Sequence, residues 1–197
     1  MKLILASASP RRKELLTVTG VKFDVVVSDA DETVSETLTP AETVALLARR
    51  KAEAVRNALG SPDGDTVILA ADTVVASGGK ILGKPKDRED AKNMLRSISG
   101  RVHEVYTGVA LVRGEKTASG AVSTAVSVRP IPEDEIERYA ASGECDDKSG
   151  AYAIQGIGGL FVEKIDGDYR NVVGLPVYYI NELLKSDFGL SLWDFMN

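Results

Sequence analysis

The chain has 197 residues, of which 44% are hydrophobic and 27% are charged, and its formal net charge is -5. This composition is typical of a globular protein with one domain, or with two lobes around one core. The acidic balance argues against a general nucleic-acid surface, which needs a basic footprint, and no stretch approaches the roughly 20 apolar residues of a membrane span. With a single cysteine, no intramolecular disulfide can form, which fits a reducing compartment, although a cysteine-poor secreted protein would look the same. We expect a cytoplasmic protein with one domain over residues 1–197, which can be bilobed, and without a membrane or stable nucleic-acid partner.

The first segments predict a strand, a helix and a second strand. The apolar run 3–6 is followed by Ser9 and Pro10, which are typical of the N-cap and the first position of a helix. Gly20 is expected to end this helix, and residues 23–27 to form the next strand.

The middle of the chain predicts a long helix followed by a hairpin and a third helix. Residues 39–42, Thr-Pro-Ala-Glu, have the pattern of a capping box, and they predict a helix that runs to about Leu59. The apolar run 67–76 predicts a buried strand that turns at Ser77–Lys80 to pair with the short strand 80–82. Asp87 is expected to cap the third helix, which ends at Gly100.

The last third of the chain continues the alternation of strands and helices. The expected elements are strands 102–112 and 117–128, a helix from Pro132 to Gly143, a glycine-rich segment 150–159, a strand 160–165 and a helix from Pro176 to about Leu184. Because this order mixes crossovers with hairpins, it predicts an α/β fold with a mixed β-sheet flanked by helices.

Asp72 is the most informative residue, because it interrupts an aliphatic run. Burying a lone carboxylate costs several kcal/mol unless a cation or hydrogen bonds compensate for it. We therefore expect Asp72 to face a metal, a basic group or a cleft at a strand end, and the alternative is an Asp that caps the next turn.

The turn at residues 7–12 predicts an anion site. Backbone N–H groups at the helix start, with Ser7 and Ser9 beside them, favour anions. Arg11 and Arg12 in the first turn oppose the helix dipole, and binding an anion such as a polyphosphate would explain their placement. The alternative is a solvated basic turn. Lys51 lies on the apolar stripe of the long helix, so it should meet an anion, or else snorkel to water.

Further candidates lie in loops. Lys84 projects from a Gly-Lys-Pro turn, and Gln155, which can donate and accept hydrogen bonds at a base edge, precedes a Gly-Ile-Gly-Gly run that allows close approach of a ligand. A surface turn and a flexible loop are the alternatives. Glu32 lies in an acidic loop that can supply oxygen ligands to Mg²⁺, and the alternative is a solvated acidic loop. His103 is expected to pack or face solvent rather than to catalyse.

Together these segments resemble the Maf family of nucleoside triphosphate pyrophosphatases. They occur in the order of that family: Ser7-Ala8-Ser9-Pro10-Arg11-Arg12, Asp31-Glu32-Thr33, Arg50-Lys51-Ala52, Ala71-Asp72-Thr73-Val74, Gly83-Lys84-Pro85, Gly150-Ala151-Tyr152-Ala153-Ile154-Gln155-Gly156 and Val172-Val173-Gly174-Leu175-Pro176. The resemblance covers nearly the whole chain, and the joint order is more specific than any single motif.

The resemblance implies an inosine-triphosphatase-like α/β fold, with an active-site cleft between two lobes, and a homodimer. It implies hydrolysis of a nucleoside triphosphate to the monophosphate and pyrophosphate by water attack on the α-phosphate, assisted by a divalent metal cation (Mg²⁺, Mn²⁺ or Co²⁺). By matching position, Asp72 is the proton acceptor or a metal ligand, Glu32 is associated with the metal, and the phosphate-binding residues are Arg12, Lys51 and Lys84.

The resemblance also points to a substrate class. Arg11, Thr73 and Gln155 match the positions tied to base choice, with the residue types of the subfamily that acts on dTTP and UTP. A house-cleaning role, with a link to cell-division arrest, would follow. The alternatives are a nucleotide-binding regulator of septum formation with little turnover and a 7-methyl-GTP pyrophosphatase.

Overall fold

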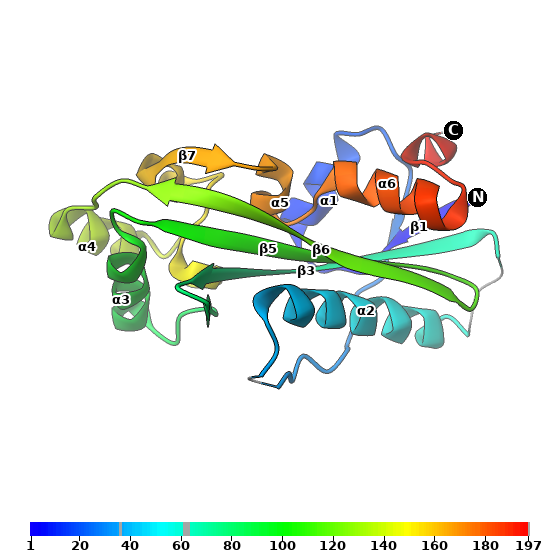
Figure 1. Cartoon of the computed structure of the whole chain (residues 1–197), viewed down its shortest axis with the longest axis horizontal. Coiled ribbons are helices and arrows are strands. Elements are labelled where there is room, and N and C mark those ends of the chain that lie inside the picture. Colours follow the sequence, from blue (N-terminus) through cyan, green and yellow to red (C-terminus); the bar gives the residue numbers. More distant parts are fainter. Residues whose placement is uncertain (36, 61–63, 197) are drawn as a thin grey trace. The chain divides into compact units, whose positions relative to one another are not determined.

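One mixed sheet organises this computed structural model, which describes residues 1–35, 37–60 and 64–196 (Figure 1). Its strands are β1 (Lys2–Leu5), β2 (Asp24–Val25), β3 (Thr66–Ser77), β4 (Lys80–Leu82), β5 (Val102–Arg113), β6 (Lys116–Val128) and β7 (Val162–Asp166). They are ordered β2-β1-β3-β5-β6-β7, and β4 pairs with β3. β1 is parallel to β2 and β3, whereas β4 and β7 are antiparallel to their partners. The predicted α/β fold with a mixed sheet is confirmed.

The chain divides into two compact units, and strands β3, β5 and β6 contribute to both. The first unit comprises Met1–Asp72, Thr107–Val122 and Gly174–Asn197, and the second comprises Thr73–Tyr106 and Ser123–Val173. The single domain and the cleft between two lobes stay predictions.

Helices cover both faces of the sheet in the first unit. They are α1 (Pro10–Thr17), α2 (Pro40–Ala58) and α6 (Val177–Phe188), followed by a 3-10 turn, η3 (Leu192–Phe195). Helix α2 lies on one face, and α1 and α6 lie on the other (Figure 1). Ala48, Ala52 and Val55 of α2 pack in one apolar cluster with residues of β1, β3 and β5.

Local hydrogen bonds determine where α2 begins, and a close backbone contact determines how near it packs to the sheet. The predicted capping box is present, since Thr39 N donates to Glu42 Oε2 (2.9 Å) and Glu42 N donates to Thr39 Oγ1 (3.3 Å). The helix then packs closely on β5 at Gly108, where an added Cβ would lie 2.1 Å from the Val44 carbonyl oxygen. A side chain at position 108 would therefore push α2 off the sheet.

The second unit contains short helices and 3-10 turns in addition to its strands. They are α3 (Arg88–Ile98), α4 (Glu133–Ser142), α5 (Tyr169–Val173) and the 3-10 turns η1 (Ser149–Ala151) and η2 (Ile157–Phe161). Asp87 caps α3 as predicted, accepting a hydrogen bond from Asp90 N (2.8 Å). Helices α3 and α4 pack together around Leu95, Ile98 and Ile136. Within the described residues, no helix is both long enough and apolar enough to cross a membrane.

The structure departs from the predicted elements mainly in short or irregular segments. Strand β2 spans two residues instead of five, and the strand expected at 160–165 begins at Val162, because the preceding glycine-rich residues form η2. Helices α5 and η3 were not predicted. Helix α6 continues to Phe188 and ends at Gly189, whose positive φ of 64° suits a C-cap glycine.

His103 is buried in the second unit, as one of the two expected outcomes. Its side chain is 1% exposed, and Nε2 lies 2.8 Å from the Tyr152 hydroxyl. Burial lowers the pKa of His103 to about 4, so the ring is neutral at pH 7.

The buried histidine predicts a loss of stability on acidification. Because the folded pKa of about 4 lies below the ordinary 6.5, the unfolded chain binds the extra proton between these values, and the free energy of unfolding should fall by about 3 kcal/mol as the pH drops from 6.5 to 4. Urea titrations across this range should show a shallower pH dependence in His103→Gln, which lacks the only histidine. Identical slopes would contradict the prediction.

Candidate active site

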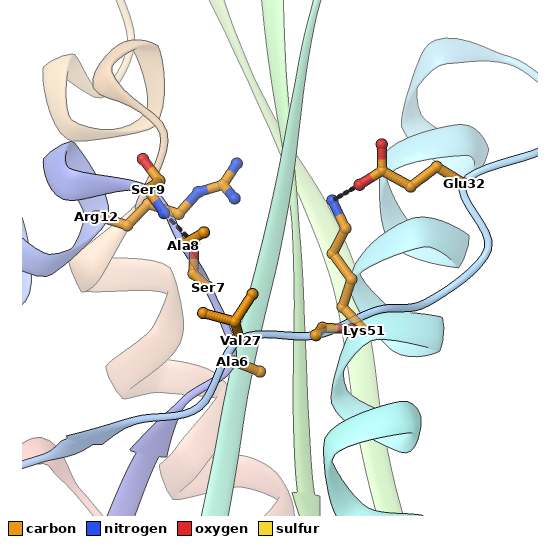
Figure 2. A pocket seen from close by; sticks show the side chains of 9 residues that line it. Ala6, Ser7, Ala8, Ser9, Arg12, Val27, Glu32 and Lys51 are labelled. Carbon is orange, nitrogen blue, oxygen red and sulfur yellow. Dashed lines mark hydrogen bonds and ion pairs between the residues drawn. The ribbon is translucent and has the colours of Figure 1, made fainter. Parts of the chain in front are cut away.

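A pocket in the first unit lies where the end of β1, the start of α1 and the middle of α2 meet a loop at residues 27–32. It is lined by Ala6, Ser7, Ala8, Ser9, Arg12, Val27, Ser28, Glu32 and Lys51. Figure 2 shows Arg12 on one side of the pocket and Lys51 with Glu32 on the other. The space not filled by protein, including the mouth, is about 450 Å³, far more than the roughly 30 Å³ of one water molecule.

Lys51 joins two carboxylates that are 40 residues apart in the chain. Its Nζ lies 2.6 Å from Asp72 Oδ1 and 2.7 Å from Glu32 Oε1. The side chains of Lys51 and Asp72 are only 14% and 13% exposed, whereas that of Glu32 is 64% exposed. Lys51 is thus the basic group that was expected to face Asp72, and Asp72 is the anion that was expected to meet Lys51. Glu32 is a second partner of Lys51, and it faces solvent.

Arg12 adds a second cation to the pocket. Its Nε donates to the Gly174 carbonyl oxygen at 2.9 Å, which fixes the guanidinium between α1 and the chain that leads into α6. Burial lowers the pKa of Arg12, and the neighbouring carboxylates of Asp72 and Glu32 act in the opposite direction. Asp72 and Glu32 therefore interact electrostatically with Arg12 as well as with Lys51.

The turn that connects β1 to α1 provides hydroxyl groups. Ser7 is buried and accepts a hydrogen bond from Ser9 N at 3.1 Å (Figure 2). Ser9 occupies the predicted N-cap position of α1, but its side chain makes no capping hydrogen bond. Arg11, next to Arg12, is half-buried and lies outside the residues that line the pocket.

Arg50 is a structural residue that the sequence reasoning missed. It sits off the apolar stripe of α2, but its Nη1 donates to the carbonyl oxygens of Thr33 (2.5 Å) and Asp31 (3.4 Å). These bonds hold the backbone on both sides of Glu32 against α2. The only sequence feature that could have indicated this role is the position of Arg50 in the motif Arg50-Lys51-Ala52.

Three further candidates, Thr73, Lys84 and Gln155, belong to the second unit. Thr73 is half-buried in β3 directly after Asp72, and Lys84 and Gln155 are exposed in loops. Their convergence with Arg12, Lys51 and Asp72 stays a prediction.

Comparisons with known proteins agree over almost the entire chain. Residues 2–187 match the model of a family described as Maf-like protein. A protein of Alkaliphilus metalliredigens named dTTP/UTP pyrophosphatase is 50% identical over 196 residues, which cover 97% of this chain and 98% of that one. Proteins of the same name from Bacillus cytotoxicus (48% identical, 96% of this chain and 98% of the relative) and Hahella chejuensis (47%, 98% and 94%) are similar as well.

A solved structure, that of the Staphylococcus aureus Ham1 protein, is a distant likeness. It is 14% identical and aligns with a TM-score of 0.45, over 65% of this chain and 72% of that chain. This similarity is too low to assign a fold family or an activity.

The partly buried Lys51 pair predicts an unequal response to two matched substitutions. Lys51→Met should lower the free energy of unfolding by about 2–4 kcal/mol, because Asp72 is left buried without its cation. Lys2→Met breaks an exposed pair with Asp24 (2.9 Å; side chains 57% and 64% exposed) and should cost less than about 1 kcal/mol. Urea denaturation of both variants measures the difference, and equal losses would show that Lys51 does not compensate a buried charge.

Proposed function

Because the chain belongs to the Maf family of proteins, whose model matches residues 2–187, we propose that it is a nucleoside triphosphate pyrophosphatase acting on dTTP and UTP. The products are the nucleoside monophosphate and pyrophosphate. Relatives of this name, 47–50% identical over nearly the whole chain, support the substrate class. A house-cleaning role in the nucleotide pool, with a link to cell-division arrest, is part of the same proposal.

One structural observation carries the proposal: two cations from distant segments, Arg12 and Lys51, line one pocket, and Lys51 is paired with the buried Asp72 behind the lining. Asp72 is bound to Lys51, and Arg12 lies across the pocket from Lys51 (Figure 2). Phosphoryl chemistry depends mainly on positioning and on neutralising the charge of phosphate oxygens. Guanidinium and ammonium groups on two sides of a pocket suit a polyphosphate, and a carboxylate beside them suits the activation of water.

A divalent cation, such as Mg²⁺, Mn²⁺ or Co²⁺, fits the donor set at this pocket. Glu32 and Asp72 bring two carboxylates to the same point, since both contact the Lys51 ammonium, and Mg²⁺ typically uses one or two carboxylates plus substrate phosphates. Within the described ranges, no three His, Cys, Asp or Glu side chains form a metal cluster. We therefore infer that the substrate supplies the remaining ligands. When bound, the cation neutralises phosphate charge and makes a nearby water more acidic.

The protein side chains then have separate tasks. Arg12, Lys51 and Lys84 would bind the phosphates, and the Ser7–Ser9 turn would orient the triphosphate. Lys51 occupies one oxygen of Asp72 in the structure. The other oxygen of Asp72 would accept the proton of the attacking water, or contact the cation. Thr73, Arg11 and Gln155 would contribute to the choice of base.

Two alternative functions receive less support. A nucleotide-binding regulator of septum formation would not need a buried carboxylate paired with a cation of the pocket. A 7-methyl-GTP pyrophosphatase would be expected to have relatives of that name among the similar chains reported above, but these are named for dTTP and UTP. A homodimer and a cytoplasmic location remain part of the proposal.

A substrate panel tests the function directly. Purified protein with Mg²⁺ or Mn²⁺ should release pyrophosphate from UTP and dTTP, and only weakly from 7-methyl-GTP. Chelation by EDTA should abolish release, because the phosphates then lose the charge neutralisation that the cation supplies. Coupled detection of pyrophosphate measures both results. Binding of UTP without any release would favour the regulator instead.

Asp72→Asn tests the carboxylate itself. The amide keeps the size of the side chain but cannot take a proton, so kcat for UTP should fall by at least ~100-fold, the scale of a lost general base. Asp24→Asn, which alters an exposed acid of β2 outside the pocket, should leave kcat unchanged. Circular dichroism and thermal denaturation check that both variants fold. Near-normal turnover by Asp72→Asn would refute the assigned role.

A further inference from the structure

Gln155 presents its amide to solvent from a turn whose two sides are held by internal hydrogen bonds. The side chain is exposed and has no hydrogen-bond partner among the residues that the structure describes. Before the turn, Ala153 N donates to the Tyr139 hydroxyl at 3.2 Å, and the turn closes through Gly156 N, which donates to Ala153 O at 3.2 Å. An amide that is free to bind, on a backbone that is fixed, is the arrangement of a preorganised recognition group.

Glu144 holds the other side of this turn. Its Oε2 accepts from Ile157 N (2.9 Å) and its Oε1 accepts from Gly158 N (3.0 Å), so the carboxylate caps the start of η2 from 13 residues earlier in the chain. Oε1 also accepts from the Tyr139 hydroxyl at 2.9 Å. Glu144 and Tyr139 therefore form one unit, here called the Glu144–Tyr139 clamp, that contacts the backbone on both sides of Gln155.

The electrostatics of the clamp favour the ionised carboxylate. Burial acts to raise the pKa of Glu144, but the N–H groups of Gly158 and Ile157 and the hydroxyl of Tyr139 outweigh it, so the pKa lies below its usual range. The clamp is thus charged and intact near neutral pH.

The glycines of the turn are explained by the same contacts. A Cβ at Gly156 would lie 2.1 Å from Glu144 Oε2, and a Cβ at Gly158 would lie 2.9 Å from both Ala153 O and the Tyr139 hydroxyl. These glycines let the backbone approach the clamp, rather than leaving the segment a flexible loop. These close contacts fix the position of the turn that carries the exposed side chain of Gln155.

We propose that Glu144, together with Tyr139, is a positioning residue for nucleobase selection: the clamp fixes the turn from which Gln155 reads the base. This inference rests on the proposed function. The glutamine amide can donate to one group and accept from its neighbour, as the edge of a uracil or thymine ring requires. Such pairing discriminates only if the amide is held within hydrogen-bond tolerance, and a displacement of about 1 Å can cost two orders of magnitude.

Glu144→Gln tests the clamp with almost no change in shape. The new amide has one oxygen and one NH₂ group, so a donor would face the N–H of Ile157 or Gly158, and the turn should shift. The ratio of kcat/KM for UTP to that for 7-methyl-GTP should fall by about tenfold or more, mainly through KM for UTP. Glu137→Gln is the matched control, because Glu137 on α4 pairs with Lys92 instead (2.6 Å) and should keep the ratio.

A double variant separates positioning from a general loss of structure. If Glu144 acts through Gln155, Glu144→Gln/Gln155→Ala should be no less selective than Gln155→Ala alone, whereas independent effects would multiply. Tyr139→Phe, which keeps the ring and removes the clamp hydroxyl, gives the same readout if Glu144→Gln does not fold.

The outcomes distinguish this inference from the function on which it rests. An unchanged ratio in a folded Glu144→Gln or Tyr139→Phe enzyme overturns the inference alone, as does an equal loss of kcat/KM for both nucleotides. No pyrophosphate release from UTP or dTTP by the unaltered chain overturns both.

Discussion

A carboxylate in the middle of an apolar strand has to be neutralised, and the ion pair between Asp72 and Lys51 does this at a separation of 2.6 Å. The pair constrains much of the first unit. Lys51 reaches Asp72 only if α2 lies close to the sheet, and the bare backbone of Gly108 allows the Val44 carbonyl to touch β5. Val44 and Lys51 are seven residues, or about two helical turns, apart and share one face of α2. The capping box fixes where that helix begins, and so which residue faces Asp72.

Local patterns predicted most of the fold because each carried its own physical cause. Thr39 and Glu42 satisfy orphan donors of a helix start, and the Gly78-Gly79 turn has the positive φ angles that a tight hairpin needs. The failures fall where tertiary contacts decide the conformation. The start of η2 is capped by Glu144, 13 residues before Ile157, and the residue pattern within 157–161 does not reveal that contact.

The candidate site divides in the same way. The helical stripe placed Lys51 inward and the aliphatic run made Asp72 conspicuous, so their pairing was within reach of pattern reasoning. Arg12 was a candidate, but its bond to Gly174 spans 162 residues and could not be inferred. Arg50 lies off the apolar stripe of α2, so the helical pattern predicts no role for it. Its role concerns the backbone around Glu32, which a side-chain pattern does not describe.

The two units hold their candidate residues by different physics, and the difference suits different tasks. In the first, Lys51 and Arg12 are long cationic side chains, and Coulomb attraction to a polyphosphate falls off gradually with distance, so they tolerate small displacements. In the second, Gln155 is a neutral amide whose hydrogen bonds weaken steeply with angle and length. Such a group needs a fixed backbone more than a charge does. The backbone bonds to Glu144 and Tyr139, with glycines where a Cβ would collide, meet that need.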